Sequence, residues 1–229
     1  TGDVNDVYDI LVRMRGEKDE EIAPKDFFPA AERTGMIVAI DRWIMENAVR
    51  LMCERLKAGV QPTFFLRVSD QTLTDKNLLP WIEKTLVGAT PSIPAGHLVF
   101  EVAEKSAEKY ITDTRGFAEG VRKLHCGFAL EHFGIGHDPM HTLELVRNVD
   151  YLKIDGVITA ALANDHKKRE TVQAYVEKAT ELKIHTVAER VEKPETMAVL
   201  YQIGIEYIQG NYVQEPEVVM TDQAKPAAR

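Results

Sequence analysis

Cysteine is scarce in this chain of 229 residues, which contains only Cys53 and Cys126. Neither residue lies at the spacing of a metal-binding or redox motif, so the sequence excludes a disulfide framework and predicts two buried thiols in a reducing compartment. The chain also lacks a signal peptide and any run of about 18 apolar residues, the length that a membrane-spanning helix needs. These absences predict a cytoplasmic domain with no membrane insertion.

Basic residues are the minority among the charged ones. Lysine and arginine number 28 against 36 aspartates and glutamates, which gives a formal net charge of −8. Because a general nucleic-acid binder needs a basic surface, we expect no nucleic-acid polymer as a partner, although a local basic pocket is compatible with this charge. Apolar residues make up 45% of the chain, enough for the core of one large α/β domain or of two small ones.

Strand-like and helix-like patterns alternate along the chain, which predicts a parallel α/β architecture. Apolar runs predict seven strands, at residues 7–15, 63–69, 97–103, 127–131, 151–155, 185–189 and 207–209. Helical patterns lie between them, at residues 30–40, 41–56, 78–87, 114–124, 140–146, 168–182 and 194–203. A closed β/α barrel normally has eight strands, and the eighth could precede Thr1. An open, doubly wound sheet is the alternative, although no glycine-rich turn follows the first strand.

Ionisable residues stand at the ends of nearly all the predicted strands. On the first strand, Asp9 and Arg13 are four residues apart and therefore point the same way. In a β/α barrel, the chemistry gathers at the C-terminal ends of the strands, and a buried charge is costly unless it is paired or bound to a ligand. The sequence therefore predicts one ring of polar side chains, made of Asp9, Arg67, Glu101, Glu104, Glu131, Lys153, Asp155, Glu189, Glu192 and Gln209.

These same positions resemble the motifs of the EAL domain family, the cyclic di-GMP phosphodiesterases of bacteria. Residues 9–13 fall where the family has Glu-Ala-Leu-x-Arg, residues 131–136 fall on Asp-Asp-Phe-Gly-x-Gly, and residues 153–155 are Lys-Ile-Asp unchanged. The resemblance runs from position 8 to about 216. It implies a TIM-like β/α barrel of the EAL type, with the first helix and strand apparently missing from this chain. It assigns residues 1–219 to a degenerate EAL domain and residues 220–229 to a flexible C-terminal tail.

The resemblance also indicates which site residues have changed. Active members of the family hold two divalent cations, an arrangement that needs several carboxylate or amide oxygens. Here the glutamate of Glu-Ala-Leu is Asp9, the metal-binding asparagine is Arg67, and the paired aspartates are Glu131 and His132. A guanidinium cannot ligate a cation, and imidazole suits Mg²⁺ poorly. We therefore expect no metal and no catalytic residue, but a vestigial site of Asp9, Arg67, Glu101, Glu131, His132, Lys153 and Glu189.

The ligand-facing positions are better preserved. Arg13 matches the family arginine that contacts a ligand phosphate, and a guanidinium fork suits phosphate oxygens. An aromatic face at Phe28 could stack on a guanine, and a carboxylate on the loop after Gln209 could accept hydrogen bonds from one. The resemblance thus predicts a ligand-binding set of Leu11, Arg13, Phe28, Asp41, Gln209, Gln214 and Glu215.

Together these features predict a catalytically inactive receptor domain that binds intact cyclic di-GMP and needs no cofactor, neither Mg²⁺ nor Mn²⁺. The losses are similar to those of a family member that regulates type IV pilus assembly and twitching motility. That likeness implies signalling to a PilZ-domain protein partner and a degenerate GGDEF domain upstream in the parent chain. Two alternatives stay open: an active metal-dependent phosphodiesterase with variant ligands, and a ligand-free protein-interaction scaffold.

Overall fold

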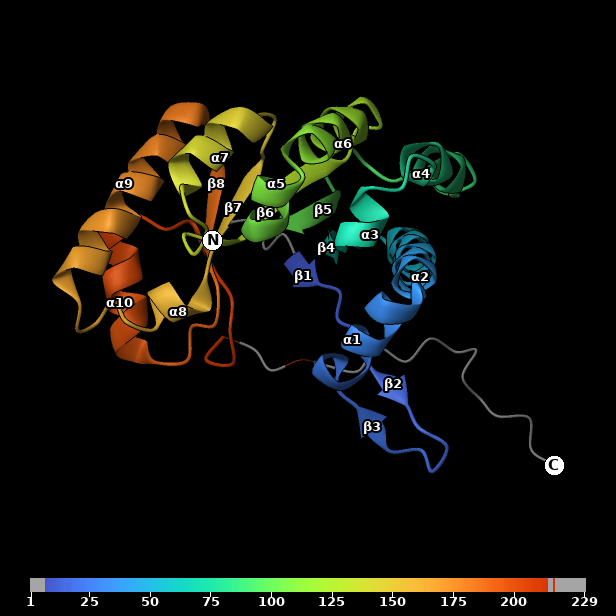
Figure 1. Cartoon of the computed structure of the whole chain (residues 1–229), viewed down its shortest axis with the longest axis horizontal. Helices are drawn as coiled ribbons and strands as arrows, with labels where there is room; N and C mark the ends of the chain where they lie inside the picture. The colour runs from blue at the N-terminus through green and yellow to red at the C-terminus, as the bar shows by residue number, and fades with distance from the viewer. Residues whose placement is uncertain (1–6, 214–215, 217–229) are drawn as a thin grey trace.

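The computed structural model describes residues 7–213 and residue 216. Seven parallel strands form one curled sheet, in the order β1 (Val7–Asp9), β4 (Thr63–Arg67), β5 (Leu98–Ala103), β6 (Gly127–Phe133), β7 (Tyr151–Ile154), β8 (His185–Ala188) and β9 (Tyr207–Ile208). Each strand pairs in parallel with its neighbour in this order. All seven predicted strands lie in this sheet, which confirms the α/β fold of the TIM-like barrel type as a half-barrel (Figure 1). The predicted tail at 220–229 lies outside the described residues.

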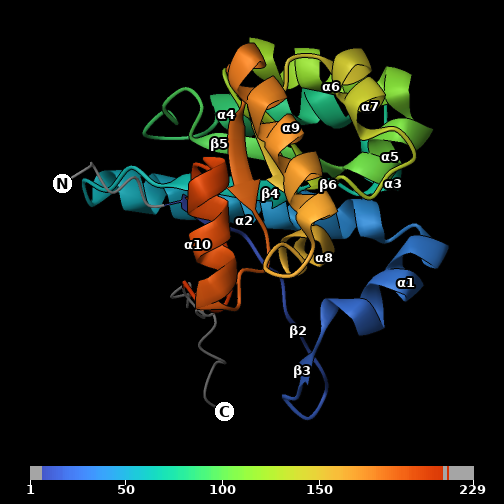
Figure 2. The ribbon, with the colours of Figure 1, turned by 90° about the vertical axis from the view of Figure 1, so that its left-hand side faces the viewer.

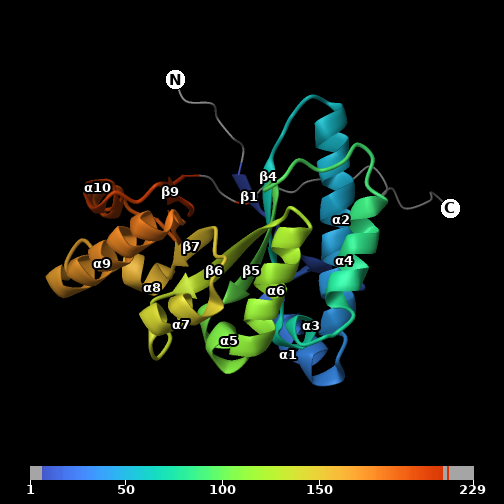
Figure 3. The same cartoon turned by 90° about the horizontal axis from the view of Figure 1, so that it is seen from above.

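Helices connect the strands and cover the outer face of the sheet. Figure 3 shows α2, α4 and α6 side by side at one end of the sheet and α9 at the other end. The bounds are α1 (Pro24–Thr34), α2 (Ile37–Lys57), α3 (Asp70–Leu73), α4 (Leu78–Val87), α5 (Glu104–Lys109), α6 (Ile111–Lys123), α7 (Pro139–Val146), α8 (Gly156–Thr159), α9 (His166–Leu182) and α10 (Pro194–Ile203). Among the described helices, none is long and apolar enough to cross a membrane.

Both faces of the central strands are buried, which explains why these strands read as nearly continuous apolar runs. Along β4, Phe64 and Leu66 join the large core beneath the helices. Phe65, between them, points to the opposite face and packs with Val99 and Ala129 inside the curled sheet. The period-two alternation of a strand thus supplies two cores from one run, and the inner core forms the floor beneath the polar side chains at the strand ends.

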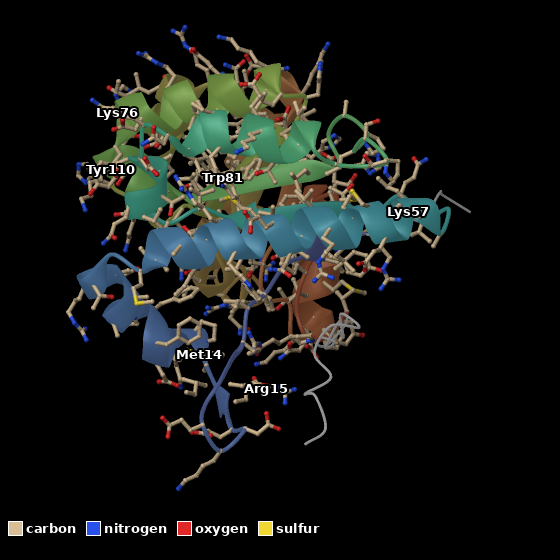
Figure 4. All side chains as sticks on the ribbon, turned by 90° about the vertical axis from the view of Figure 1, so that its right-hand side faces the viewer. Met14, Arg15, Lys57, Lys76, Trp81 and Tyr110 are labelled. Carbon is tan, nitrogen blue, oxygen red and sulfur yellow. The ribbon has the colours of Figure 1, made fainter. Side chains whose placement is uncertain are left out.

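The opening stretch differs from the prediction of one strand over residues 7–15. Ile10 still donates its backbone N–H to Phe65 (3.0 Å), after which the chain leaves the sheet. A second strand, β2 (Met14–Arg15), pairs antiparallel with β3 (Glu21–Ile22). This β2–β3 hairpin extends away from the sheet below α1 (Figure 2). Figure 4 shows the side chains of Met14 and Arg15 on it, well apart from Trp81 on the main body.

The first helix also begins earlier than predicted. The pattern placed the helix after Pro29, whereas α1 starts at Pro24 and contains Pro29. A proline at the first helical position loses no hydrogen bond, because that N–H has no partner within the helix. Pro24 therefore provides the start signal, and Pro29 removes one later backbone donor from a short helix.

Candidate functional site

Most of the predicted ring of polar side chains forms at the C-terminal edge of the sheet, where parallel strands bring their ends together. Glu192 is instead exposed on the segment between β8 and α10. Asp9 ends β1, Arg67 ends β4, Lys153 lies on β7, and Glu101 and Glu131 lie on the two strands between β4 and β7. Glu101 stands opposite Arg67 in the register of β4 and β5. Segments up to 200 residues apart in sequence meet here, since Gln209, after β9, donates a side-chain hydrogen bond to Asp9.

Lys153 is the centre of one half of this ring. Its side chain is only 2% exposed, and its Nζ donates to Asp9 (2.9 and 3.0 Å) and to Glu101 Oε2 (2.8 Å). Burial lowers the pKa of Lys153, but the carboxylates of Glu101 and Asp9 outweigh it and raise that pKa above its usual range. Lys153 is therefore an ammonium held between the carboxyl groups of Asp9 and Glu101.

Glu101 is the buried acidic partner of Lys153, and its burial makes the ionised form unfavourable. The side chain is buried on β5, and burial raises its pKa to about 8 against the opposing effect of the Lys153 ammonium. A carboxylate deprived of water is stable only while its counter-ion stays in place. Lys153 and Glu101 therefore depend on each other.

His132 reaches the other half of the ring through a β-bulge. The register of β6 against β7 shifts between Leu130 and Phe133, and His132 adopts a left-handed backbone with φ of 53°. In a regular strand, Glu131 and His132 would point to opposite faces. The bulge turns both side chains toward the same edge. Histidine is one of the few residues besides glycine that tolerate this backbone well.

The imidazole of His132 lies against two carboxylates. Its Nδ1 is 3.0 Å from Asp155 Oδ2 and 3.0 Å from Glu189 Oε2. The contact with Glu189 raises the pKa of His132, with burial opposing the rise. Glu189 Oε2 is fully buried and receives no hydrogen bond of good geometry from the described residues. We call His132, Asp155 and Glu189 the His132 cluster.

The His132 cluster fits a divalent cation. One donor atom from each of its three residues lies within 4.8 Å of the others, and the buried Glu189 Oε2, although it lies 3.0 Å from His132 Nδ1, accepts no well-formed hydrogen bond from the described part of the chain. Imidazole together with carboxylates suits Mn²⁺, Zn²⁺ and related ions better than Mg²⁺. Asp155 was in the predicted ring but not in the vestigial site, although its place in Lys-Ile-Asp at a strand end was the available signal.

Arg67 and Glu131 make a further ion pair of the ring. Arg67 Nε lies 2.7 Å from Glu131 Oε1, and the Arg67 side chain is 53% exposed whereas that of Glu131 is 5% exposed. Burial raises the pKa of Glu131, while Arg67 and then His132 oppose that rise. Arg67 thus stands at the solvent side of a buried carboxylate.

The described residues of the predicted ligand-binding set lie on four separate segments of the chain. Leu11 and Arg13 lie on the exposed segment between β1 and β2, and Phe28 on α1 packs edge-on against Phe27 at 4.8 Å between ring centroids. Asp41 is buried on α2 and accepts the backbone N–H of Ser69 at 3.0 Å. Gln214 and Glu215 lie outside the described residues. A ligand role for these residues, and for Gln209, stays a prediction.

Glu104 anchors the loop that follows His132, a role that sequence reasoning missed. Its Oε2 accepts the backbone N–H groups of Gly134 (2.9 Å), Ile135 (3.0 Å) and Gly136 (2.7 Å). Burial raises the pKa of Glu104, and the hydrogen bonds from the loop oppose the rise. The only sequence signal was a glutamate at the end of the β5 run.

Glu104→Ala is expected to lower the free energy of unfolding by about 2 kcal/mol, because three backbone donors lose their common acceptor. Glu108→Ala is the matched control. Glu108 lies one helical turn further along α5 and accepts from His137 and Asp138 nearer the surface (2.7 and 3.0 Å). Urea unfolding of both variants checks this difference, and equal losses would contradict the anchoring role.

Comparison with known proteins gives consistent results. The family described as EAL domain matches residues 2–216. The crystal structure of the FimX EAL domain from Pseudomonas aeruginosa bound to c-di-GMP is 31% identical, with a TM-score of 0.86, covering 94% of this chain and 85% of that one. The PaMucR phosphodiesterase in a c-di-GMP complex is 26% identical, with a TM-score of 0.83, covering 91% and 83%.

Among curated proteins, the cyclic di-GMP phosphodiesterase PdeF of Escherichia coli is 31% identical over 218 residues, covering 95% of this chain and 29% of PdeF. The probable cyclic di-GMP phosphodiesterase PdeN of the same organism is 30% identical, covering 91% of this chain and 40% of PdeN. The chain thus spans less than half the length of these curated relatives.

The prediction of a non-enzyme without a usable metal site is wrong. Several relatives are named cyclic di-GMP phosphodiesterases, and the described residues include a cluster that fits a cation. The prediction judged each substitution by its residue type alone. It missed that the bulge at His132 places an imidazole between the Asp155 and Glu189 carboxylates, which makes a donor set of a different kind.

Proposed function

This chain belongs to the EAL domain family, and on that premise we propose that it binds cyclic di-GMP and hydrolyses one of its phosphodiester bonds. The observation that carries the proposal is the His132 cluster at the C-terminal edge of a parallel sheet. In folds of this class, that edge is where chemistry is performed. The names of relatives such as PdeF, and the ligand in the FimX EAL crystal structure, support the choice of substrate.

Two groups of side chains in the ring have different roles in this reaction. His132, Asp155 and Glu189 would hold a divalent cation, which supplies an activated water and neutralises charge on a phosphoryl oxygen when bound. Lys153 orients the carboxylates of Asp9 and Glu101 toward the same edge, and Gln209 fixes Asp9 from the far end of the sheet. We propose this cation-dependent reaction in place of the expected metal-free site.

The direct test is product formation. Incubation of the purified chain with cyclic di-GMP and Mn²⁺ should yield the linear dinucleotide, separated by reversed-phase chromatography. Chelation of the metal with EDTA should stop the reaction. Mg²⁺ should support it less well than Mn²⁺, because imidazole is a weak ligand for Mg²⁺. Absence of linear product at every metal concentration would overturn the hydrolase proposal.

Glu21→Gln is expected to tighten cyclic di-GMP binding about two- to fivefold. In the structure, Glu21 Oε1 pairs with Arg13 Nε at 2.9 Å, so this carboxylate competes with a ligand phosphate for the guanidinium. Both side chains are well exposed, and exposed pairs are worth less than about 1 kcal/mol, which limits the gain.

Asp19→Asn is the matched control, because Asp19 pairs with Arg15 at 2.7 Å on the same β2–β3 hairpin. Calorimetric titration in EDTA, which prevents turnover, measures both variants. A gain in the Asp19 variant equal to that in the Glu21 variant would point to overall charge instead of release of Arg13.

The finer predictions about the parent protein rest on the likeness to the FimX EAL domains. We propose that a PilZ-domain protein binds this domain, that a GGDEF domain precedes it, and that the whole acts in type IV pilus and twitching regulation. Co-elution of the chain with a PilZ-domain protein in the presence of cyclic di-GMP would support the partner. Separate elution at micromolar concentrations of both would contradict it.

A further inference from the structure

We propose that Arg67 is a phosphate-binding residue of this site, and that it takes a phosphodiester oxygen of the dinucleotide beside the His132 cluster. The inference rests on the proposed function and deepens it. It gives a binding role to a side chain that would otherwise only repel a cation.

Arg67 is the accessible cation of the ring. Its side chain is 53% exposed at the end of β4, whereas that of Lys153 is 2% exposed and fully engaged by carboxylates. The acidic side chains around it, those of Glu101 and Glu131, are 6% and 5% exposed. An anion that approaches this edge of the sheet from solvent therefore meets the Arg67 guanidinium before any other positive charge of the ring.

The guanidinium has unused donors. A guanidinium carries five N–H groups in a planar fork. Within the described residues, the Arg67 ion pair is made by Nε, which lies 2.7 Å from Glu131 Oε1, and the Arg67 charge also acts on the buried carboxyl group of Asp41. No hydrogen bond or ion pair of this described part of the chain uses either Nη group of Arg67. The two Nη groups form the edge that matches a pair of phosphate oxygens. Glu131 is buried and cannot follow the side chain outward, so it holds the fork in one orientation.

Glu131 also places this fork next to the His132 cluster. One of its oxygens contacts Arg67 Nε, and the other lies 3.8 Å from His132 Nε2. Arg67 and His132 therefore flank a single carboxylate. A phosphate group is large enough to receive Arg67 on one oxygen while another of its oxygens faces the His132 cluster, which is the position a scissile phosphodiester needs.

The alternative is that Arg67 only neutralises Glu131. The two roles predict opposite changes in the affinity for a metal cation when Arg67 is replaced. Loss of a phosphate-binding cation weakens the binding of the anionic dinucleotide. The same loss strengthens the binding of a metal cation, because two positive charges that share Glu131 repel each other. A structural role predicts that both affinities fall together, since the whole site would loosen.

Arg67→Gln tests this in the intact chain. Glutamine retains an N–H donor for Glu131 but has no charge. Calorimetry with cyclic di-GMP in EDTA should show at least a tenfold weaker Kd, and titration with Mn²⁺ alone should show a several-fold tighter one. Arg67→Lys, which keeps the charge without the fork, should fall between wild type and Arg67→Gln for the dinucleotide. Arg50→Ala is the matched control, since Arg50 pairs with Glu54 at 3.4 Å on α2 away from this edge.

The outcomes separate the two proposals. Unchanged dinucleotide affinity in Arg67→Gln, or a parallel loss of both affinities, would overturn the role of Arg67 while product formation by the wild type still supports the hydrolase. Absence of dinucleotide binding by the wild type itself would overturn both. Circular dichroism melting of each variant confirms that the folded state is being compared.

Discussion

Replacement of Lys153 by methionine is expected to destabilise the fold by about 3–5 kcal/mol, the range seen when one partner of a buried ion pair is removed. Methionine keeps most of the side-chain volume, so the loss comes from charge. The carboxylates of Asp9 and Glu101, each within 3.0 Å of the Lys153 ammonium, are left near the barrel floor without a counter-ion. Urea unfolding followed by circular dichroism measures the change.

The loss in free energy of unfolding that Lys153→Met causes, relative to wild type, should grow as the pH rises above about 8. Burial holds the pKa of Glu101 at about 8 in the folded protein, well above its ordinary value of 4.5, and loss of Lys153 raises that pKa further. An acid with a raised folded pKa costs stability as the pH rises through the window from its unfolded to its folded value, and this window is wider in the variant. Up to about pH 8 the window is common to both proteins, so the difference between variant and wild type should be nearly constant from about pH 5 to pH 8 and should grow above pH 8, where only the wild-type Glu101 becomes ionised.

The double variant Lys153→Met with Glu101→Gln provides the control. A neutral amide at position 101 removes the unpaired charge, so the double variant should recover about 1–2 kcal/mol at pH 8 relative to Lys153→Met alone. Wild-type stability of Lys153→Met at pH 8, or no recovery in the double variant, would show that the pair is not the source of the effect.

The ring at the strand ends could be predicted from the sequence because each member needs only a local pattern. Asp9, Arg67 and Lys153 each lie at or near the end of an apolar run, and parallel strands bring such ends to one edge of the sheet. The seven strands were predictable for the same reason. None of these inferences required knowledge of which strands are neighbours.

Which side chains of the ring contact one another could not be predicted in this way. Period two would place His132 on the face opposite Glu131, and the bulge that reverses this depends on the register of β6 against β7. The contact between His132 and Asp155 likewise needs that register. The β2–β3 hairpin, near which Arg13 pairs with Glu21, was not predicted, because its short strands carry no periodic signal.

His132→Ala is expected to lower kcat for cyclic di-GMP hydrolysis at least about 100-fold, because residues that only support a metal ligand already cost about 10–100-fold when changed. The variant removes the one nitrogen donor of the His132 cluster and leaves the Asp155 and Glu189 carboxylates facing each other. Mn²⁺ affinity, measured by calorimetry without substrate, should fall in parallel. Product formation at saturating cyclic di-GMP gives kcat.

Two further variants make this result specific. His132→Asp should retain activity and shift the metal preference toward Mg²⁺, since aspartate also tolerates the left-handed backbone and supplies a hard oxygen ligand. His185→Ala is the control, because His185 pairs with Glu206 at 2.7 Å at the opposite, N-terminal end of β8. It removes a histidine–carboxylate pair without touching the ring, so kcat should be unchanged. Equal kcat values for His132→Ala and His185→Ala would show that the His132 cluster takes no part in the reaction.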